Sequence, residues 1–345
     1  MRVSICIPTY NRAPQLRHLL DSIAQQDGHA LEFEIAISDN ASTDDTPALI
    51  ENYVGKGLPI VYRRLDTNRG FDRNILNAVD IASGDYCWLF GSDDLVEPGA
   101  FAKIEQVLAV FAASAQSMAE LPAGISVGSQ GYNADLTRHI FVDDHISTEF
   151  ATDTVLRGRD QTIGTIGPWL GFISSIIVRR DRWRAVVAGA DLSPYFKGYI
   201  HTYLVARMLD ADSTWLCVPD RLVGCRTGNE SFQASNEFAR TRLDIVGYDL
   251  AFGDTLGRDN LAYRRAMAKV ATFYIRTHFL GAKLHGVSSA YWKQAIPMSV
   301  SYYWRYPMFW IRTFPISIMP RFILLTAQAL YRRTIKPNRE VVLNK

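Results

Sequence analysis

The first hundred residues alternate between short apolar runs and amphipathic segments. The apolar runs predict buried strands over residues 2–9, 33–39, 59–65 and 85–91. The segments between them predict helices over residues 14–26, 46–53 and 71–83. We expect Gly84 to end the third helix in a left-handed conformation. This strand-helix order predicts an α/β fold with a mixed, mainly parallel sheet and helices on its faces.

Beyond residue 100 the pattern is less regular. Strands are predicted after Ile125 and Arg138, and residues 171–183 predict a strand that leads into a helix. Residues 198–209 predict a helix, and residues 214–232 predict a strand, a turn and a polar loop. Residues 236–285 are mostly helical in pattern, so we expect a helical extension after the sheet.

Polar clusters stand where three of the predicted strands end. They are Thr9-Tyr10-Asn11-Arg12, the stretch 39–44, and Ser92-Asp93-Asp94. Ligands bind at the carboxyl ends of parallel strands, so these clusters predict one common site. The adjacent carboxylates of Asp93 and Asp94 repel each other, and a divalent cation would offset that repulsion.

Asp93 and Asp94 are therefore the predicted metal ligands. Mg²⁺ or Mn²⁺ favours a site with few carboxylates, which leaves positions for phosphate oxygens. Successive strand residues point in opposite directions, so we expect one aspartate on the metal and the other on a sugar or ribose; Asp94 is the preferred metal ligand. The alternative is an N-cap for the helix after Pro98, which accounts for one aspartate but not for two.

The composition is that of a globular protein rather than of a disordered or fibrous chain. The chain has 345 residues, of which 48% are hydrophobic, so a sizeable core is expected. The four cysteines contain no Cys-x-x-Cys pair, which predicts reduced thiols rather than a zinc or redox site. The N-terminal residues lack the pattern of a signal peptide, so we expect the chain in the cytoplasm.

The C-terminal segment 291–345 differs from the rest. It holds nine Lys or Arg residues, one acid (Glu340), and 11 of the chain's 40 aromatic residues. No uncharged apolar run approaches the ~20 residues that span a bilayer. Aromatics interleaved with arginine favour helices in the lipid headgroup layer of an anionic membrane. The alternative is a helical cap packed on the main domain. Prolines and aliphatic residues favour lipid over nucleic acid as the partner.

The motifs CIPTYNR, SDNASTDDT, NRGFDRN and LFGSDD resemble glycosyltransferase family 2, which has the GT-A fold. GFDRNI, YCWLFGSDD and a GN-S loop resemble abequosyltransferase-like enzymes of O-antigen synthesis. The resemblance implies a transferase domain over residues 1–232, with a nucleotide-sugar half (1–100) and an acceptor half (101–232). A helical region (233–290) and a basic aromatic, membrane-associating tail (291–345) would follow.

The resemblance also implies the substrates. Such enzymes move a dideoxyhexose from a nucleotide diphosphate to a polyprenyl-diphosphate-linked oligosaccharide, and CDP is the favoured nucleotide. The enzyme would then act at the inner face of the plasma membrane. The alternative is a non-catalytic carbohydrate- or lipid-binding protein that kept the fold. A dinucleotide-binding oxidoreductase is excluded because residues 8–14 contain no glycine.

Individual roles follow from the resemblance. Asp39 would read the nucleobase edge, unless it is only a turn residue. Thr9, Tyr10 and Arg12 would line the nucleotide pocket, together with Asp93. The remaining donor-site candidates follow the third strand or lie in the later polar loop: Asn68, Arg69, Asp72, Arg73, Arg226 and Asn229. Arg69 or Arg73 would pair with phosphate, although Arg73 also suits a solvated helix face, and the loop also suits a simple surface turn.

Two positions depart from the family pattern. Gly91 stands where the family often has the first aspartate of Asp-x-Asp-Asp, and Ile200-His201 stands where it has Glu-Asp. His201 is therefore the candidate base for the acceptor hydroxyl, because the unperturbed imidazole pKa of about 6.5 suits proton abstraction. The alternative is a hydrogen-bonding structural histidine.

Overall fold

The structure is a computed structural model of the chain, and it describes residues 1–117, 120–140, 145–228 and 238–334. The chain divides into two compact units. The first comprises residues 1–130, 144–162 and 169–226, and the second comprises residues 131–143, 163–168 and 227–345.

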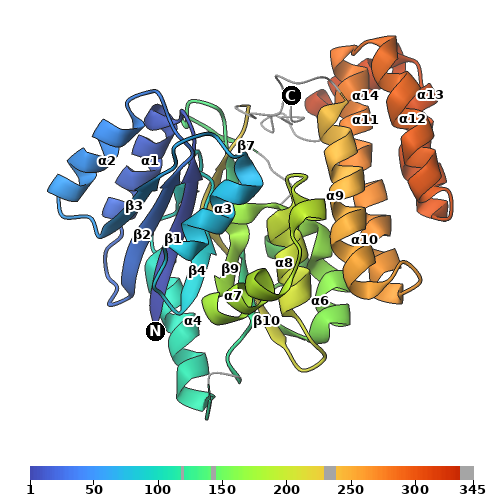
Figure 1. The fold of residues 1–345 in the computed structure, drawn as a ribbon. Coiled ribbons are helices and arrows are strands. Elements are labelled where there is room, and N and C mark those ends of the chain that lie inside the picture. Colours follow the sequence, from blue (N-terminus) through green and yellow to red (C-terminus); the bar gives the residue numbers. More distant parts are fainter. Residues whose placement is uncertain (118–119, 141–144, 229–237, 335–345) are drawn as a thin grey trace. The chain divides into compact units, whose positions relative to one another are not determined.

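A ten-stranded mixed sheet is the main element (Figure 1). Its strands are β1 (Arg2–Thr9), β2 (Glu32–Asp39), β3 (Ile60–Arg64), β4 (Tyr86–Leu89), β5 (Leu95–Val96), β6 (Gly124–Tyr132), β7 (His139–Ile140), β8 (Thr154–Arg157), β9 (Ile176–Arg179) and β10 (Thr214–Arg226). The order is β3-β2-β1-β4-β9-β6-β10-β5, with β7 beside β6 and β8 beside β10. β1 to β4 are parallel, as predicted, and β9 joins β4 in antiparallel register.

Helices flank this sheet on both faces. In chain order the helices up to residue 208 are α1 (Ala13–Ala24), α2 (Thr46–Gly55), α3 (Phe71–Asp80), α4 (Ala100–Ser114), α5 (His145–Glu149), α6 (Gly158–Ile166), α7 (Arg180–Gly189) and α8 (Ile200–Met208). Short 3-10 turns lie at η2 (Gly167–Gly171), η3 (Ile173–Ser175) and η4 (Ser193–Tyr195). The expectation of a mixed sheet with flanking helices is confirmed.

The two faces of the parallel half differ in side-chain size. Toward α1, α2 and α4, the strands present large apolar residues such as Ile5, Ile35 and Trp88, which form the core with Leu16 and Phe101. Burial of such side chains stabilises the fold by about 1.5–3 kcal/mol each. This face therefore supplies most of the hydrophobic stabilisation of the first unit.

Toward α3 the same strands present small and polar residues. Ser4 Oγ donates to Glu34 Oε1 (2.6 Å), and Ser38 Oγ donates to Asn74 Oδ1 of α3 (2.5 Å). Glu34 is 2% exposed and also accepts the backbone N–H and the hydroxyl of Ser83. These hydrogen bonds hold the pKa of Glu34 below its usual value even though burial opposes this shift. Because these buried polar groups all have hydrogen-bond partners, α3 can lie close to the sheet.

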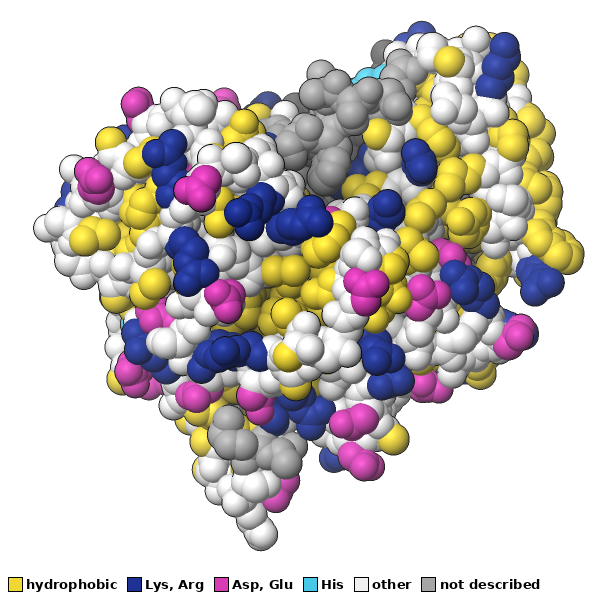
Figure 2. Space-filling view, in the orientation of Figure 1, with side chains coloured by type: hydrophobic (Ala, Val, Ile, Leu, Met, Phe, Trp, Pro, Cys, Tyr) yellow, Lys and Arg dark blue, Asp and Glu magenta, His cyan; other side chains and the backbone are white. Residues whose placement is uncertain are grey.

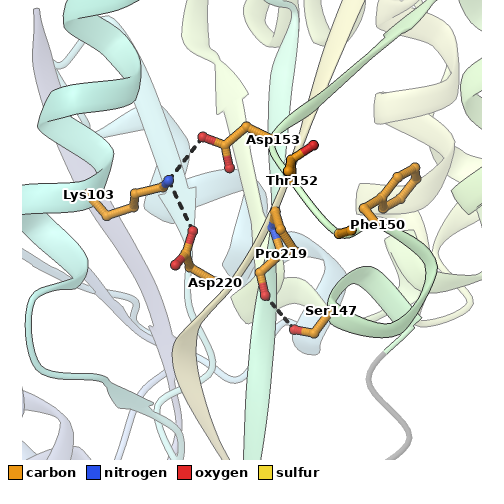
Figure 3. Close-up of a pocket in the computed structure, with 8 residues that line it drawn as sticks. Lys103, Ser147, Phe150, Thr152, Asp153, Pro219 and Asp220 are labelled. Atoms are coloured by element: carbon orange, nitrogen blue, oxygen red, sulfur yellow. Dashed lines mark hydrogen bonds and ion pairs between the residues drawn. The ribbon is translucent and has the colours of Figure 1, made fainter.

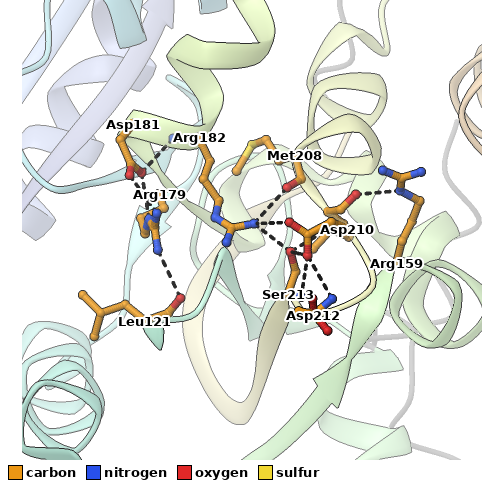
Figure 4. A network of polar contacts seen from close by, with 10 residues as sticks. Leu121, Arg159, Arg179, Asp181, Arg182, Met208, Asp210, Asp212 and Ser213 are labelled. Atoms are coloured by element: carbon orange, nitrogen blue, oxygen red, sulfur yellow. Dashed lines mark hydrogen bonds and ion pairs between the residues drawn. The ribbon is translucent and has the colours of Figure 1, made fainter. Parts of the chain in front are cut away.

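A second polar network fixes α7 beneath β9 (Figure 4). Arg179 is 5% exposed and forms two 2.7 Å hydrogen bonds with the carboxylate of Asp181. Arg182 donates to the Met208 carbonyl (3.2 Å) and to Ser213 Oγ (2.7 Å). Arg182 thereby ties the first turn of α7, which directly follows β9, to the end of α8.

The second unit is mainly helical. Its helices are α9 (Ala239–Leu256), α10 (Leu261–Thr272), α11 (Tyr274–His285), α12 (Ser289–Tyr303), the π-helical turn η6 (Phe309–Thr313), α13 (Phe314–Ile318) and α14 (Arg321–Thr334). Asp244 is fully buried and accepts from His278 Nε2 (2.6 Å) and Arg240. The predicted helical extension is confirmed.

The stretch 214–232 differs from the prediction. β10 runs unbroken from Thr214 to Arg226, and no turn interrupts it. Its first residues pair with β8 and its later residues pair with β5. Pro219, which has no N–H to donate, lies where the strand changes partners, and its carbonyl accepts from Ser147 Oγ (2.6 Å). The proline marks this exchange of partners rather than a turn.

Gly84 also has a different role from the one predicted. α3 ends at Asp80, and Gly84 is absent from the residues with positive φ. A Cβ at Gly84 would lie 2.7 Å from Ser4 Oγ, 2.8 Å from Ser4 N and 2.9 Å from the Arg2 carbonyl. The glycine is therefore required by close approach to β1.

Replacing Gly84 with alanine should lower the free energy of unfolding by about 1–3 kcal/mol, because backbone atoms must move to admit the methyl group. Gly55→Ala is the matched control, since nothing lies within 4 Å of the place that a methyl group would take there. Denaturant unfolding of both variants is the measurement. Equal stability of the two variants would contradict the close-approach argument.

Candidate active site

The loops after β1 and β2 are joined by hydrogen bonds. Asn11, which has a φ of 50°, donates its N–H to Ser42 Oγ (2.9 Å) and accepts from Thr43 N (2.7 Å). Asp44 accepts from the N–H of Ala13 at the start of α1 (3.0 Å). The two predicted polar clusters therefore form one rigid rim at the carboxyl edge of the sheet, as expected.

Thr9 and Tyr10 lie on this rim with contrasting exposure. Thr9 is 2% exposed, and its hydroxyl has no hydrogen-bond partner among the described residues. Tyr10 is 42% exposed. A free hydroxyl and an exposed aromatic ring are suited to polar and stacking contacts with a ligand. Their assignment to the nucleotide pocket stays a prediction.

The chain turns directly after β4, so Asp93 and Asp94 do not follow strand alternation. Asp94 N donates to the Gly91 carbonyl (3.2 Å), which closes the turn. Asp94 is 5% exposed; it accepts from Ser174 Oγ (2.5 Å) and from Arg226 N (3.1 Å). Burial, with the neighbouring Asp93 charge, raises the pKa of Asp94 to about 8. Positive charge in the site would therefore stabilise the ionised form.

Two arginines surround the acidic doublet. Arg12 Nη1 lies 3.2 Å from Asp93 Oδ2, which joins the tip of β1 to the tip of β4. Arg226, at the end of β10, donates its Nε to the Asp93 carbonyl (2.9 Å) and is 8% exposed. Its Nη2 lies 3.0 Å from His18 Nδ1 of α1. The ends of β1, β4 and β10 thus meet at the acidic doublet. Asn229, which is predicted beside Arg226, lies outside the described residues.

Gly91 explains how both carboxylates are accommodated. A Cβ at this position would lie 3.0 Å from Asp93 Oδ1, 3.1 Å from Asp94 Oδ2 and 3.3 Å from Ser174 Oγ. A side chain at residue 91 would therefore crowd both carboxylates and the Ser174 hydroxyl. Gly91, which departs from the pattern of the resembled family, thus allows both carboxylates to lie against the backbone at this turn.

The donor set fits a hard divalent cation. Asp93 Oδ1 and Asp94 Oδ2 are carboxylate oxygens that both lie beside Gly91. No group of three or more His, Cys, Asp or Glu side chains is placed to hold a metal within the described ranges. Two carboxylates would leave the remaining coordination positions to ligand oxygens and water, as Mg²⁺ and Mn²⁺ prefer.

Asp39 lies fully buried at the end of β2. Its Oδ1 accepts from Ser42 N (2.8 Å), its Oδ2 accepts from the Tyr62 hydroxyl (2.9 Å), and Arg64 Nε lies 3.7 Å away. Burial and the hydrogen bond to Asp39 raise the pKa of Tyr62. In this arrangement Asp39 shapes the turn after β2, which favours the turn alternative. Contact with a nucleobase stays a prediction.

The loop before α3 is held by an asparagine. Asn40 is 3% exposed. Its side-chain Nδ2 donates to Asn68 Oδ1 (2.8 Å), and its side-chain Oδ1 accepts from Arg69 N (2.8 Å). The side chain of Arg69 is exposed beside this loop. Asn68 therefore positions the loop, whereas Arg69 is available to an anionic ligand.

Asp72 and Arg73 contact the segment before α8. Asp72 is 8% exposed and accepts from the N–H groups of Gly198 (2.6 Å) and Ile200 (3.2 Å). Burial raises the pKa of Asp72. Arg73 lies over the Phe196 ring, 4.3 Å from its centroid. Both residues thus connect α3 to α8, and donor binding by either stays a prediction.

His201 is buried in the first turn of α8. It is 1% exposed, its Nε2 lies 3.2 Å from the Gly171 carbonyl, and its Nδ1 has no partner among the described residues. Burial lowers the pKa of His201 to about 4. A buried imidazole of this basicity suits the structural alternative better than proton abstraction. Its role as the base stays a prediction.

Ser174 and His18 are not among the predicted site residues, and Asn40 is predicted only as part of the polar stretch 39–44. Ser174 Oγ accepts from Gly91 N (2.9 Å) while it donates to Asp94, and its own carbonyl accepts from Trp88 Nε1 (2.8 Å). Ser174 lies 80 residues from Asp94 in sequence, within an apolar stretch without polar neighbours that mark a site. Only the pairing of β4 with β9 brings the two together.

A separate depression lies on the first unit (Figure 3). Its lining includes Lys103, Phe150, Asp153 and Asp220. Lys103 Nζ lies 3.0 Å from one carboxylate oxygen of each aspartate, so the charges that line the depression are paired. None of the predicted site residues lines it.

Comparison with known proteins identifies the family. The model of glycosyl transferase family 2 matches residues 4–117. The abequosyltransferase RfbV of Salmonella typhimurium is 32% identical over 280 residues, which cover 78% of this chain and 80% of the relative. The chain belongs to glycosyltransferase family 2. The predicted resemblance and the assignment as a glycosyltransferase are confirmed.

A further relative and two solved structures are similar in part or in fold. The GalNAc(5)-diNAcBac-PP-undecaprenol beta-1,3-glucosyltransferase of Campylobacter jejuni is 32% identical over 106 residues, which cover 30% of this chain and 34% of the relative. Staphylococcus aureus TarS 1–349 with UDP-GlcNAc has a TM-score of 0.58 at 16% identity, over 95% of this chain and 88% of that chain. The mannosyltransferase PcManGT of Pyrobaculum calidifontis, with GDP-Man and Mn²⁺, has a TM-score of 0.54 at 15% identity, over 96% and 88%. These likenesses confirm the GT-A-like fold.

We expect Ser174→Ala to weaken Mn²⁺ binding about tenfold, because Asp94 loses a charge-assisted hydrogen bond that fixes its orientation. Ser174→Thr, which keeps the hydroxyl, should restore most of the affinity. Ser175→Ala is the matched control, since its hydroxyl donates to the Phe172 carbonyl instead. Mn²⁺ titration followed by electron paramagnetic resonance is the measurement, and equal affinity of all four proteins would refute the positioning role.

His201 should also make folding pH-dependent. Its pKa of about 4 lies below that of an exposed histidine, so the unfolded chain binds the proton first as the pH falls. The free energy of unfolding therefore has its full value above about pH 6.5. It falls by on the order of 3 kcal/mol as the pH is lowered from there to about 4. His201→Gln should remove this part of the pH dependence, measured by denaturant unfolding. His285→Gln, at an exposed position, is the control and should keep the pH dependence of the wild type. The same dependence of stability on pH in both variants would contradict the low pKa of His201.

Proposed function

We propose that the chain transfers a hexose from a nucleotide diphosphate sugar to a lipid-linked oligosaccharide, with a divalent cation at Asp93 and Asp94. The observation that carries the proposal is the convergence of these carboxylates with Arg12 and Arg226 at the carboxyl edge of the sheet. A pyrophosphate group carries several negative charges, and these groups are the kind that bind it.

The arrangement accounts for the chemistry of the donor. Departure of the nucleotide develops negative charge on a phosphate oxygen, which bound Mg²⁺ or Mn²⁺ would neutralise. In this proposal Arg12, which lies beside Asp93, and the exposed Arg69 pair with phosphate oxygens, and the exposed ring of Tyr10 stacks on the ligand. Asp94 is oriented by Ser174 and by the backbone of Arg226. The Mn²⁺ and GDP-Man in the PcManGT structure support a metal-assisted donor site.

The substrates are proposed from the relatives. The name of the Salmonella relative is abequosyltransferase, and the name of the Campylobacter relative specifies an acceptor on PP-undecaprenol. We therefore propose a dideoxyhexose donor and a polyprenyl-diphosphate-linked acceptor of surface polysaccharide synthesis. The choice of CDP as the favoured nucleotide rests on the sequence resemblance alone. Thermal unfolding with a panel of UDP-, GDP-, CDP- and dTDP-sugars would identify the donor, because the bound nucleotide stabilises the folded state.

Hydrolysis of the identified donor tests the metal site. Asp94→Asn and Asp93→Asn should each lower the Mn²⁺-dependent rate about a hundredfold or more, because charge on the leaving diphosphate loses stabilisation. Asp153→Asn, which alters a carboxylate of the separate depression, should leave the rate unchanged. A Mn²⁺-independent rate that survives both doublet substitutions would refute the proposal. An absence of turnover in the wild-type protein with every donor and acceptor would favour the non-catalytic alternative.

A further inference from the structure

Exposed apolar side chains are concentrated in one part of the second unit. Among the described residues, 16 large apolar side chains are exposed, and nine of them lie between Trp304 and Leu330. Figure 2 shows apolar side chains over the C-terminal helices, interspersed with Lys and Arg. We define the C-terminal apolar surface as Trp304, Met308, Trp310, Ile311, Ile318, Phe322, Ile323 and Leu325. Apolar patches of this kind mark interaction sites.

The segment before α14 has two distinct faces. One row is buried and anchors the segment in the unit: Tyr303, Phe309, Thr313 and Ile316. Thr313 Oγ1 donates to the Ala271 carbonyl (2.8 Å), which fixes η6 against α10. The opposite row includes Trp304 (55% exposed), Ile311 (67%) and Ile318 (69%). The exposed row is therefore held in place by a packed row, rather than being a loose end.

α14 exposes most of its large apolar side chains. Phe322 is 68% exposed, and Ile323 and Leu325 are 43% and 41% exposed. Between residues 321 and 330, only Leu324 and Gln328 are half-buried, and they are four residues apart on one face. A helix normally buries its apolar face. Something outside the described part of the chain must therefore cover this one.

The helices that carry this surface are sharply bent. No single helix among the described residues is long and apolar enough to cross a membrane. The pair Phe309–Ile318 and Arg321–Leu330 meets the criteria of length and composition only together, and it is bent by 111°. Pro320 stands at the bend, where it prevents one continuous helix.

The charged residues of the segment that carries this surface have one sign. Residues 291–334 contain no Asp or Glu, and the chain beyond Gly286 holds one acid. Arg305 lies over the Trp304 ring, 5.0 Å from its centroid, and Arg305 and Arg312 are both exposed. Trp310 Nε1 donates to the Trp304 carbonyl (3.0 Å). Tryptophan and arginine beside aliphatic residues are typical of the interface between headgroups and acyl chains.

We propose that the C-terminal apolar surface docks on an anionic lipid bilayer and lies in its headgroup layer. Anionic headgroups complement Arg305, Arg312 and Arg321, while the acyl chains cover Ile318, Phe322 and Leu325. A second copy of this chain is the poorer occupant, because two cationic surfaces would face each other. The surface belongs to the second unit and shares no residue with the site at Asp93 and Asp94, so the proposal does not depend on the proposed transferase reaction.

Flotation of the full chain tests the proposal, with vesicles of phosphatidylethanolamine and phosphatidylglycerol. The double variant Phe322→Glu, Leu325→Glu should reduce the bound fraction about tenfold or more, because apolar area is lost and charge is added. The matched control is Val54→Glu, Val110→Glu, which alters two apolar side chains that are 48% and 63% exposed on α2 and α4. The control variant should bind vesicles like the wild type. Both double variants should unfold at the melting temperature of the wild type.

A charge variant and a spectroscopic readout complete the test. Arg305→Gln with Arg312→Gln should weaken binding about fivefold per arginine on phosphatidylglycerol vesicles, but not on phosphatidylcholine vesicles. Tryptophan emission should shift to the blue on binding, and Trp304→Phe with Trp310→Phe should remove most of that shift. Equal flotation of the wild type and the α14 variant would overturn the proposal. So would a dimer in lipid-free solution that the α14 variant dissociates, since the occupant would then be a second copy.

Discussion

The candidate site depends on two adjacent carboxylates confined in one buried turn. Asp94 is 5% exposed and would be costly to ionise by itself, yet it accepts hydrogen bonds from Ser174 and from the backbone of Arg226. Those donors come from η3 and from the end of β10, which belong to the later half of the sheet. The parallel half alone would leave the doublet without either contact. The antiparallel strands β9 and β10 are thus part of the site as much as of the fold.

The contrast between the two sheet faces has a consequence for α3. On the face of α1, α2 and α4, large apolar side chains fill the space to the helices. On the face of α3, Ser4, Cys6 and Ser38 bring the helix close, and Asn74 reaches back to donate to the Thr9 carbonyl (3.1 Å). The same helix begins with Asp72, which holds the N–H groups before α8. α3 therefore connects the tip of β1 to the first turn of α8.

The parallel half of the fold is readily predicted from sequence, because its signals are local. Strand and helix periods, Pro14 near a helix start and polar clusters at strand ends all lie within windows of ten residues or so. The partner exchange at Pro219 depends on β8 and β5, which no local pattern links to β10. The prediction for Gly84 is wrong for the same reason, since its constraint comes from β1, about 80 residues away.

The predicted site residues likewise divide into those that meet at the site and those that distant parts of the fold bury elsewhere. Asp93, Asp94 and Arg12 meet in the structure because they follow strand ends that a parallel sheet brings together. Arg226, which is predicted in a polar loop, joins them from the end of the antiparallel strand β10. Asp72 and His201 instead face the protein interior, and burial changes what an ionisable group can do there. Residue type and spacing indicate that a carboxylate or an imidazole is present near a site. They do not indicate whether it faces ligand or packs under the helix beside it, because that depends on which distant backbone groups occupy its hydrogen-bonding capacity.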